Sequence, residues 1–337
     1  MSKSIKKKDY DYKSKYSSKT TYKPDSYYYC GEAFLNACGV PGPLRGSINM
    51  LLGHSNTAKT TALILSAVDA QRKGDLPVFI ITERKWKWER AIQLGFHAEQ
   101  NEDGEWIGDF IYNDDFDYIE QATDFVNEIL NDQEKGLIDR NIVFLWDSIG
   151  SIPCKMTFEG KGGKQHNAAA LSDKIGMGIA GRITKTRKEE WPTKENPLVS
   201  TLIVVNQPWV DIPDNPFGQP EIKPKGGNAL YLACSYVFLF GNQKKAGINL
   251  LEATKNNRKI TFATRTKISV LKDHDTGISY KDGKIIAVHN GFIDDTKVAL
   301  EEYKEKYSTM WKEKLGNDFE FTETTVDTIF DTTDDDS

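Results

Sequence analysis

Nine residues, GHSNTAKTT at positions 53–61, have the types and spacing of a phosphate-binding loop. In such a loop the backbone N–H groups surround the phosphates, a lysine reaches the β and γ oxygens, and the next hydroxyl ligates Mg²⁺. Lys59 and Thr60 occupy these two positions, but Ala58 stands where the usual pattern has its second glycine. Alanine keeps every backbone donor, and its methyl group costs about 1 kcal/mol if residue 58 needs a positive φ. The nucleotide-binding residues predicted from the loop are Gly53, His54, Ser55, Asn56, Thr57, Ala58, Lys59, Thr60 and Thr61.

Asp147 is a candidate second ligand for the metal. It ends the apolar run NIVFLWD at 141–147, and a carboxylate at the end of a buried strand can hold Mg²⁺ beside a phosphate loop. An aspartate in this position is also a common turn former. Together with the loop, the metal interpretation is favoured, with Thr60 and Asp147 as the metal residues.

The elements that must position these residues alternate along the chain. Apolar runs suited to buried strands lie at 47–52, 77–82, 109–113, 141–147 and 200–206. Stretches with helical periodicity lie at 60–74, 117–133 and 167–190. This alternation predicts an α/β fold with a mostly parallel sheet and helices on both faces. The later runs at 234–241, 259–272 and 284–292 have no helices between them, which predicts an antiparallel β extension.

Charge is concentrated at the two ends of the chain. Residues 1–28 hold eight lysines and three aspartates, and residues 317–337 hold eight acidic residues and no Lys or Arg. We expect a basic, tyrosine-rich segment at 1–30 that is disordered or contacts a neighbouring subunit, and an acidic disordered tail at 317–337. A core at 31–289 and a small helical piece at 290–316 lie between them. The sequence contains no apolar run long enough for a membrane helix, so we expect a cytoplasmic protein.

Four blocks of sequence, in order, resemble the RecA-type recombinases. They are GHSNTAKTT (53–61), FIITERKWKWERAIQLG (79–95), FLWDSIGSI (144–152), and TLIVVNQ (201–207) followed by a long segment and GGNAL (226–230). The resemblance covers about residues 31–275, and the shortened, acid-tailed form is similar to the UvsX-like strand-exchange recombinases of bacteriophages. It implies a RecA-like P-loop ATPase core with ATP and Mg²⁺ as cofactors, and the host cytoplasm as the location if a phage encodes the chain.

The resemblance also implies catalytic roles for Glu83 and Gln207 beside Lys59. Independently of it, hydrolysis needs a carboxylate at a strand end to orient the attacking water, although Glu83 could instead be a surface acid. Gln207 would bond the γ-phosphate and pass its presence to the following loop, or else would be a buried amide at a turn. In filaments of this family the neighbouring subunit adds cations to the nucleotide site, and Lys272 is the candidate for that role here.

A long segment at 208–225 with five prolines is typical of a functional loop rather than a purely structural one. Trp209 and Phe217 could stack on single-stranded bases, but acidic residues outnumber lysines in this segment, so phosphate contacts must come partly from 155–188. A flexible linker and a solvated helix face are the alternative for that region. The predicted DNA-binding residues are Lys161, Lys164, Arg182, Trp209, Phe217, Lys223, Lys225, Gly226, Gly227 and Asn228.

The resemblance therefore implies a recombinase that forms homo-oligomeric helical filaments on single-stranded DNA and exchanges it with a homologous duplex. Single-strand-binding and loader proteins are candidate partners. A ring-forming helicase motor with the same core is one alternative, although such motors usually carry a second large domain. A DNA-binding mediator that has lost hydrolysis is the other, and the candidate roles of Glu83 and Gln207 speak against it.

Overall fold

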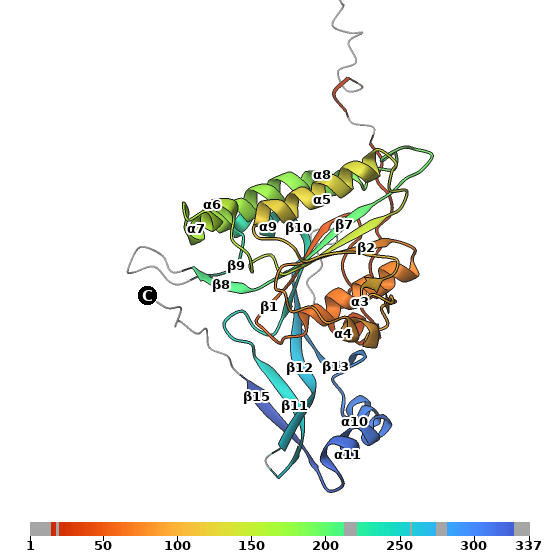
Figure 1. The fold of residues 1–337 in the computed structure, drawn as a ribbon, viewed down its shortest axis with the longest axis vertical. Coiled ribbons are helices and arrows are strands. Elements are labelled where there is room, and N and C mark those ends of the chain that lie inside the picture. The colour runs from red at the N-terminus through yellow and green to blue at the C-terminus, as the bar shows by residue number, and fades with distance from the viewer. Residues whose placement is uncertain (1–14, 18–19, 212–220, 257, 274–281, 327–337) are drawn as a thin grey trace, which may run out of the picture.

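The computed structural model describes residues 15–17, 20–211, 221–256, 258–273 and 282–326. Its centre is an 11-stranded sheet whose main path runs β14-β13-β12-β10-β1-β7-β6-β2-β5, with β11 and β15 joined beside β12 (Figure 1). The parallel part consists of β10 (Cys234–Phe240), β1 (Ile48–Gly53), β7 (Ser200–Asn206), β6 (Ile142–Asp147), β2 (Leu76–Ile81) and β5 (Ile111–Asn113). The expected α/β fold with a mostly parallel sheet is confirmed.

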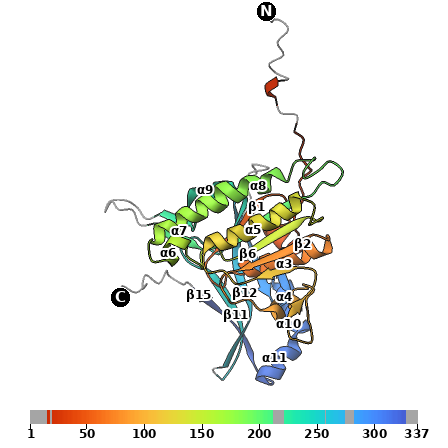
Figure 2. The same ribbon diagram turned by 45° about the horizontal axis from the view of Figure 1, so that its top comes forward.

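Helices cover both faces of the parallel part because its strands are apolar on both sides. Every residue of β1 is buried, and its side chains alternate between two cores: Leu51 lies in one, Met50 and Leu52 in the other. The first core is closed by α2 (Glu32–Cys38), α3 (Lys59–Arg72) and α4 (Trp88–Gln93). The second is closed by α5 (Ile119–Glu134), α7 (Lys164–Leu171), the π-helix η1 (Ser172–Ile179), α8 (Ala180–Lys185) and α9 (Gly227–Ala233) (Figure 2).

The antiparallel extension is built on β12 (Arg258–Asp273), a long strand that pairs with β10 at one end and with β11 (Ile248–Lys255) at the other. β13 (Gly283–Val288) and β14 (Gly291–Asp294) continue the sheet. A third apolar cluster, which includes Leu251, Val288 and Trp311, joins this extension to α10 (Lys297–Lys306) and α11 (Ser308–Leu315). The region expected as a small helical piece thus contains two helices preceded by a strand of the main sheet.

Three sequence expectations need correction. The run at 234–241, which is expected in the antiparallel extension, forms β10; this strand is parallel to β1 at one edge and antiparallel to β12 at the other. Part of the tail expected to be disordered forms β15 (Glu320–Val326), which pairs with β11 through backbone bonds that composition does not reveal. The N-terminal segment is partly folded, since Tyr28 and Cys30 are fully buried against the first core; residues 1–14 and 327–337 lie outside the described part.

The proline-rich segment at 208–225 contains a β-hairpin, in which β8 (Pro208–Asp211) pairs with β9 (Glu221–Pro224). The hairpin projects from the edge of the core below the helical layer (Figure 1). Residues 212–220, which connect the two strands in sequence and include Phe217, lie outside the described residues. The short elements β3 (Glu99–Gln100), β4 (Trp106–Ile107) and α6 (Lys155–Phe158) complete the described chain. Within the described ranges, the helices are all too short or too polar to span a membrane.

Candidate functional site

The phosphate loop connects β1 to α3, as the sequence predicts. Gly53 ends β1, and a Cβ added there would lie 2.4 Å from the Phe240 carbonyl oxygen and 2.7 Å from Thr57 Oγ1. Only glycine fits at this close approach of two strands. Ala58 has φ 74° and ψ 19°, so it adopts the left-handed conformation that the usual glycine would favour. The condition under which the methyl group of Ala58 costs about 1 kcal/mol is therefore met, and α3 begins at the next residue, Lys59.

Lys59 is a buried ammonium with a carbonyl as its hydrogen-bond partner. Its side chain is 7% exposed and Nζ donates to the His54 carbonyl oxygen. Burial lowers the pKa of Lys59 to about 8, and the nearby carboxylates of Asp147 and Glu83 only partly oppose this. A polyphosphate would add the negative charge that offsets the cost of burying this ammonium. The residue present therefore fits the terminal phosphates of a nucleotide.

The two predicted metal residues are in direct contact. The Thr60 hydroxyl donates to Asp147 Oδ2 at 2.8 Å, although the two residues lie on different elements, at the start of α3 and the end of β6. Burial raises the pKa of Asp147 to about 6, and the neighbouring Glu83 also raises it. A divalent cation would relieve this buried carboxylate, and hydroxyl and carboxylate oxygens are the donors that Mg²⁺ prefers. The donor set fits Mg²⁺.

Glu83 lies beside the same pair, directly after β2. Its Oε1 accepts a hydrogen bond of 2.8 Å from the Ser148 hydroxyl, which holds the carboxylate at the cavity wall. The chain after β2 is fixed to β6, because Thr82 N–H donates to the Asp147 carbonyl oxygen at 2.9 Å. The structure thus places Glu83, Lys59 and Asp147 together, and the catalytic role of Glu83 stays a prediction.

Gln207 links the cavity to the β8–β9 hairpin. It follows β7 and lines the same cavity as Glu83. Its carbonyl oxygen accepts from the Lys225 N–H at 3.3 Å, and Asn206 Nδ2 donates to the Lys225 carbonyl oxygen at 2.8 Å. The base of the hairpin is therefore tied to a residue that lines the cavity. A shift of Gln207 would be transmitted to the hairpin through these bonds.

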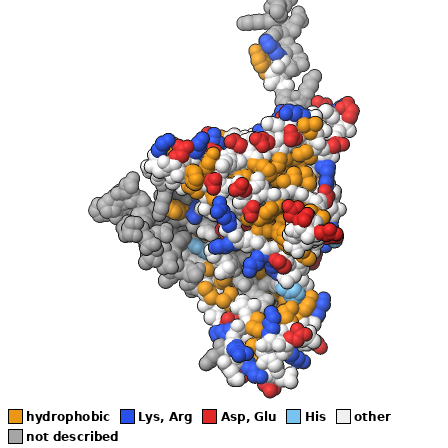
Figure 3. Space-filling model, viewed as in Figure 1, with side chains coloured by type: hydrophobic (Ala, Val, Ile, Leu, Met, Phe, Trp, Pro, Cys, Tyr) orange, Lys and Arg blue, Asp and Glu red, His pale blue; other side chains and the backbone are white. Residues whose placement is uncertain are grey.

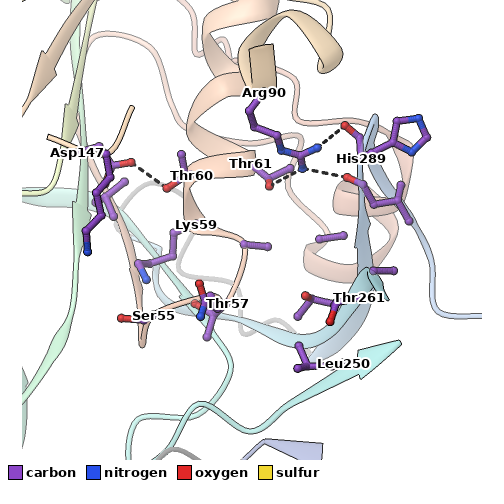
Figure 4. Close-up of a pocket in the computed structure, with 18 of the residues that line it drawn as sticks. Ser55, Thr57, Lys59, Thr60, Thr61, Arg90, Asp147, Leu250, Thr261 and His289 are labelled. Atoms are coloured by element: carbon purple, nitrogen blue, oxygen red, sulfur yellow. Dashed lines mark hydrogen bonds between the residues drawn. The ribbon is translucent and has the colours of Figure 1, made fainter. Parts of the chain in front are cut away.

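These side chains line one cavity of about 700 Å³ (Figure 4). One end is formed by the phosphate loop, Glu83, Asp147 and Gln207. The opposite wall comes from β11, β12 and the end of β13, and it was not predicted from the sequence. Its lining residues are Leu250, Thr261, Phe262, Ala263, Thr264, Ala287, Val288 and His289. Arg90 on α4 lies between the two ends and was also missed, because no local motif marks a residue that reaches the site only through folding.

The predicted DNA-binding residues fall into two groups. The first group lies on the hairpin and its exit into α9, and consists of Trp209, Lys223, Lys225, Gly226, Gly227 and Asn228. Trp209 is 41% exposed. Gly226 and Gly227 have φ 96° and 72°, which explains the two glycines at the start of α9. The side chain of Lys223 and the whole of Phe217 lie outside the described part.

The second group lies in the helical layer. Lys161 forms an ion pair with Glu159 at 2.8 Å, and Lys164 begins α7 with a side chain that is not described. Arg182 on α8 donates to Asn127 Oδ1 and Asn131 Oδ1 on α5. Basic and acidic side chains are interspersed on the face of this layer in Figure 3. The contacts of Arg182 favour helix packing, so its role in DNA binding stays a prediction.

Lys272 lies outside the lining of the large cavity. Its Nζ donates to the carbonyl oxygens of Tyr231 and Leu232, at 3.1 and 2.7 Å, near the carboxyl end of α9. Within one protomer it therefore binds the end of a helix. Its expected contribution to a neighbour's nucleotide site stays a prediction.

Comparison with known proteins gives distant relatives. No family model matches the chain. It is 25% identical over 237 residues to Protein RecA of Campylobacter hominis, covering 70% of this chain and 58% of that protein. It is 28% identical over 194 residues to Protein RecA of Campylobacter lari, covering 58% and 48%. It is 26% identical over 338 aligned positions to Protein RecA of Staphylococcus aureus, covering 88% and 86%.

The chain therefore spans less than two thirds of the two Campylobacter proteins and most of the Staphylococcus protein. With the sheet order and the phosphate loop, these relatives establish the fold as a RecA-like α/β core. The identities of these relatives to this chain are between 24% and 28%.

Proposed function

We propose that this chain is an ATP- and Mg²⁺-dependent recombinase of the bacteriophage type, acting in the host cytoplasm. It would form helical filaments on single-stranded DNA and pair that strand with a homologous duplex. Hydrolysis of ATP would loosen the filament.

One observation carries the proposal. A single cavity is lined by side chains from four separate segments of the chain. They are Lys59 and Thr60, Glu83, Asp147, and Gln207. Phosphoryl transfer depends on positioning and electrostatic stabilisation, so it requires a cation, a metal ligand and a water-orienting carboxylate together. A site that only bound a nucleotide would need no carboxylate at the position of Glu83.

Each residue has a distinct part in the proposed hydrolysis. Lys59 would hold the β and γ oxygens, while Thr60 and Asp147 would hold Mg²⁺, which would neutralise charge on those oxygens. The Glu83 carboxylate would accept a proton from the attacking water and orient it in line with the γ-phosphate. The Gln207 amide would donate to the γ-phosphate, and its backbone bond to Lys225 would carry this contact to the hairpin.

The hairpin supports the DNA-binding part of the proposal. Trp209 is the partly exposed aromatic side chain of β8, and its backbone position pairs with Lys223 on β9. An indole ring can stack on any base, so Trp209 suits binding without sequence preference. Trp209→Ala should weaken binding of single-stranded DNA by about tenfold. Ile107→Ala, which removes a 47% exposed side chain on β4, is the matched control.

The test measures ATP hydrolysis by the full-length protein with and without single-stranded DNA, together with negative-stain imaging. We expect DNA-stimulated hydrolysis and helical filaments. Glu83→Gln should lower hydrolysis by about a hundredfold or more while nucleotide binding persists. Glu89→Gln, an exposed acid in the first turn of α4, is the control and should leave the rate unchanged.

Other outcomes would replace the proposal. Closed rings on DNA would indicate the helicase motor, and DNA-bound filaments without hydrolysis would indicate the non-hydrolysing mediator. Equal rates for Glu83→Gln and the unmodified protein would remove Glu83 from the reaction.

A further inference from the structure

A second cavity lies at the opposite edge of the parallel sheet from the nucleotide cavity. It has a volume of about 240 Å³ and is bordered by Asn141 and Val199, which immediately precede β6 and β7. The nucleotide cavity is lined by Asp147 and Gln207, at the other ends of the same two strands. The second cavity is therefore separate from the residues of the proposed hydrolysis.

The charged side chains that line this cavity are all cationic. Its polar lining consists of Lys23, Ser26, Arg45, Asn141 and Arg187, and the rest is proline and valine. Among the described residues, no carboxylate contributes to the lining. Two carboxylates pair with its arginines from outside: Asp75 with Arg45, and Asp25 with Arg187. These two ion pairs leave the charge of the third cation, Lys23, to be accounted for.

Lys23 adds a positive charge that has no acidic partner among the described residues. Its Nζ donates to three carbonyl oxygens after α8, those of Thr186, Trp191 and Leu198, at 2.7, 3.1 and 2.6 Å. Carbonyl groups satisfy the N–H groups of an ammonium but carry no net charge. Burial accordingly lowers the pKa of Lys23 to about 8. An anion in the cavity would offset the cost of burying this charge.

Arg45 supplies a buried donor that lacks an acceptor. Its side chain is 16% exposed, and Nη2 donates to both carboxylate oxygens of Asp75, at 2.8 and 2.6 Å. Its Nε is buried and has no hydrogen-bond partner among the described residues. A buried N–H group without an acceptor is costly. Because Arg45 lines the cavity, a ligand bound there could supply the acceptor.

The donors favour a phosphate group over other anions. They come from three separate segments of the chain, namely residues 23–26, Arg45, and Arg187 after α8. A phosphate presents oxygens in several directions, whereas a carboxylate presents two in one plane. Guanidinium groups also match the geometry of phosphate oxygens. The cavity is several times larger than the roughly 30 Å³ that one water molecule takes in the liquid, so it has room for a phosphate group.

We propose that this cavity is a second phosphate-binding site, in which Arg45, Arg187 and Ser26 hold a tetrahedral oxyanion beside the ammonium of Lys23. The bound phosphate would fasten the N-terminal strap, residues 20–28, to the segment that follows α8. Free phosphate and a phosphate of a nucleic-acid backbone share this chemistry. The inference goes beyond the proposed function and does not depend on it, since the two cavities lie at opposite edges of the sheet.

The test uses inorganic phosphate and two variants of Ser26, a half-buried residue of the lining. Ser26→Asp places a negative charge in the cavity, and Ser26→Asn has nearly the same shape without the charge. In about 20 mM phosphate, compared with chloride at equal ionic strength, the melting temperature of the full-length protein should rise by about 2 °C. Ser26→Asn should keep this rise. Ser26→Asp should lose it and should melt higher than Ser26→Asn in chloride.

The two variants also separate specific binding from general salt effects. Phosphate stabilises folded proteins by exclusion from their surface, and this effect acts equally on both variants. Equal responses of Ser26→Asp and Ser26→Asn to phosphate would therefore overturn the inference.

Hydrogen exchange locates the bound ion. Phosphate should slow exchange at the backbone amides of Lys23 and Arg45, which donate to the carbonyl oxygens of Arg187 and Ser26, each at 2.8 Å. The unmodified protein and Ser26→Asn should show this protection, and Ser26→Asp should not. Protection confined to the phosphate loop at 53–61 would place the ion in the nucleotide cavity and would also overturn the inference.

Single-stranded DNA distinguishes the two sources of the phosphate. If backbone phosphates occupy the cavity, Ser26→Asp should bind DNA severalfold more weakly than Ser26→Asn at low salt. Equal DNA affinities, together with the expected response to inorganic phosphate, would assign the site to the free ion. A failure of ATP hydrolysis would contradict the proposed function and leave this inference standing.

Discussion

Replacing Ala58 with glycine should stabilise the protein, although glycine is usually unfavourable at the start of a helix. Ala58 has φ 74° and ψ 19°, and an L-residue other than glycine pays about 1–2 kcal/mol for this left-handed conformation. Glycine removes that strain but gives the unfolded chain more freedom, which costs about 0.4–1 kcal/mol. The expected net gain is therefore about 0.5–1 kcal/mol, or about 2 °C in melting temperature.

The measurement is chemical and thermal unfolding of the full-length protein without nucleotide. Ala67→Gly is the matched control, because Ala67 is a fully buried residue inside α3. That change should destabilise by about 1 kcal/mol or more, since glycine lowers helix propensity and leaves a small void. If Ala58→Gly proves as destabilising as Ala67→Gly, residue 58 is not held in the left-handed region and the account of the loop is wrong. Nucleotide affinity should be unchanged, since both residues keep the backbone N–H.

Three further predictions concern the site and the tail. Asp147→Asn should abolish most of the Mg²⁺ dependence of nucleotide affinity, measured by titration with and without a chelator, and an unchanged dependence would place the metal elsewhere. Gly53→Ala should destabilise the fold and weaken nucleotide binding together, because its Cβ would lie 2.4 Å from a carbonyl oxygen; normal unfolding and binding would contradict that contact. The hydrogen bond from Arg265 holds the pKa of Glu323 below its usual value of 4.5. The stabilisation of β15 by Glu323 should therefore be complete above about pH 4.5 and be lost as the pH falls through the lowered pKa. Hydrogen exchange in residues 320–326, corrected for intrinsic rates, should therefore be faster in that acidic window than at neutral pH. The variant Glu323→Gln should show fast exchange already at neutral pH. Equal protection of the unmodified protein in the acidic window and at neutral pH would refute this.

The local parts of the site could be predicted from the sequence because their signals are local. The phosphate loop is one continuous segment between a buried strand and a helix, so residue types and spacing identify Lys59 and Thr60 directly. Asp147 could be placed because a carboxylate at the end of an apolar run lies at the carboxyl edge of a parallel sheet. The alternation of strands and helices likewise predicted the parallel part of the fold.

Other features depend on pairing between distant segments and could not be found this way. β10 looks like a member of a β-rich extension, and only its register with β1 makes it parallel. The acidic composition of the tail suggested disorder, yet β15 forms because the edge of β11 offers unpaired backbone groups and Arg265 offers a charge partner. The amino-acid composition of a segment indicates how much apolar surface it can bury. It does not indicate whether the edge strand of a nearby sheet has free backbone groups with which the segment can pair.

By itself, the sequence determined the fold class, the phosphate loop and the candidate Asp147, since hydrophobic period and motif spacing are properties of short stretches. The candidates Glu83 and Gln207 came from the resemblance of longer blocks to the RecA-type recombinases. Only the tertiary structure decided that these side chains share one cavity, that Gln207 is bonded to the exit of the hairpin, and that Arg90 faces the β11–β13 wall. The physical reason is that such contacts join residues up to about 200 positions apart, and their geometry is set by strand register and helix packing.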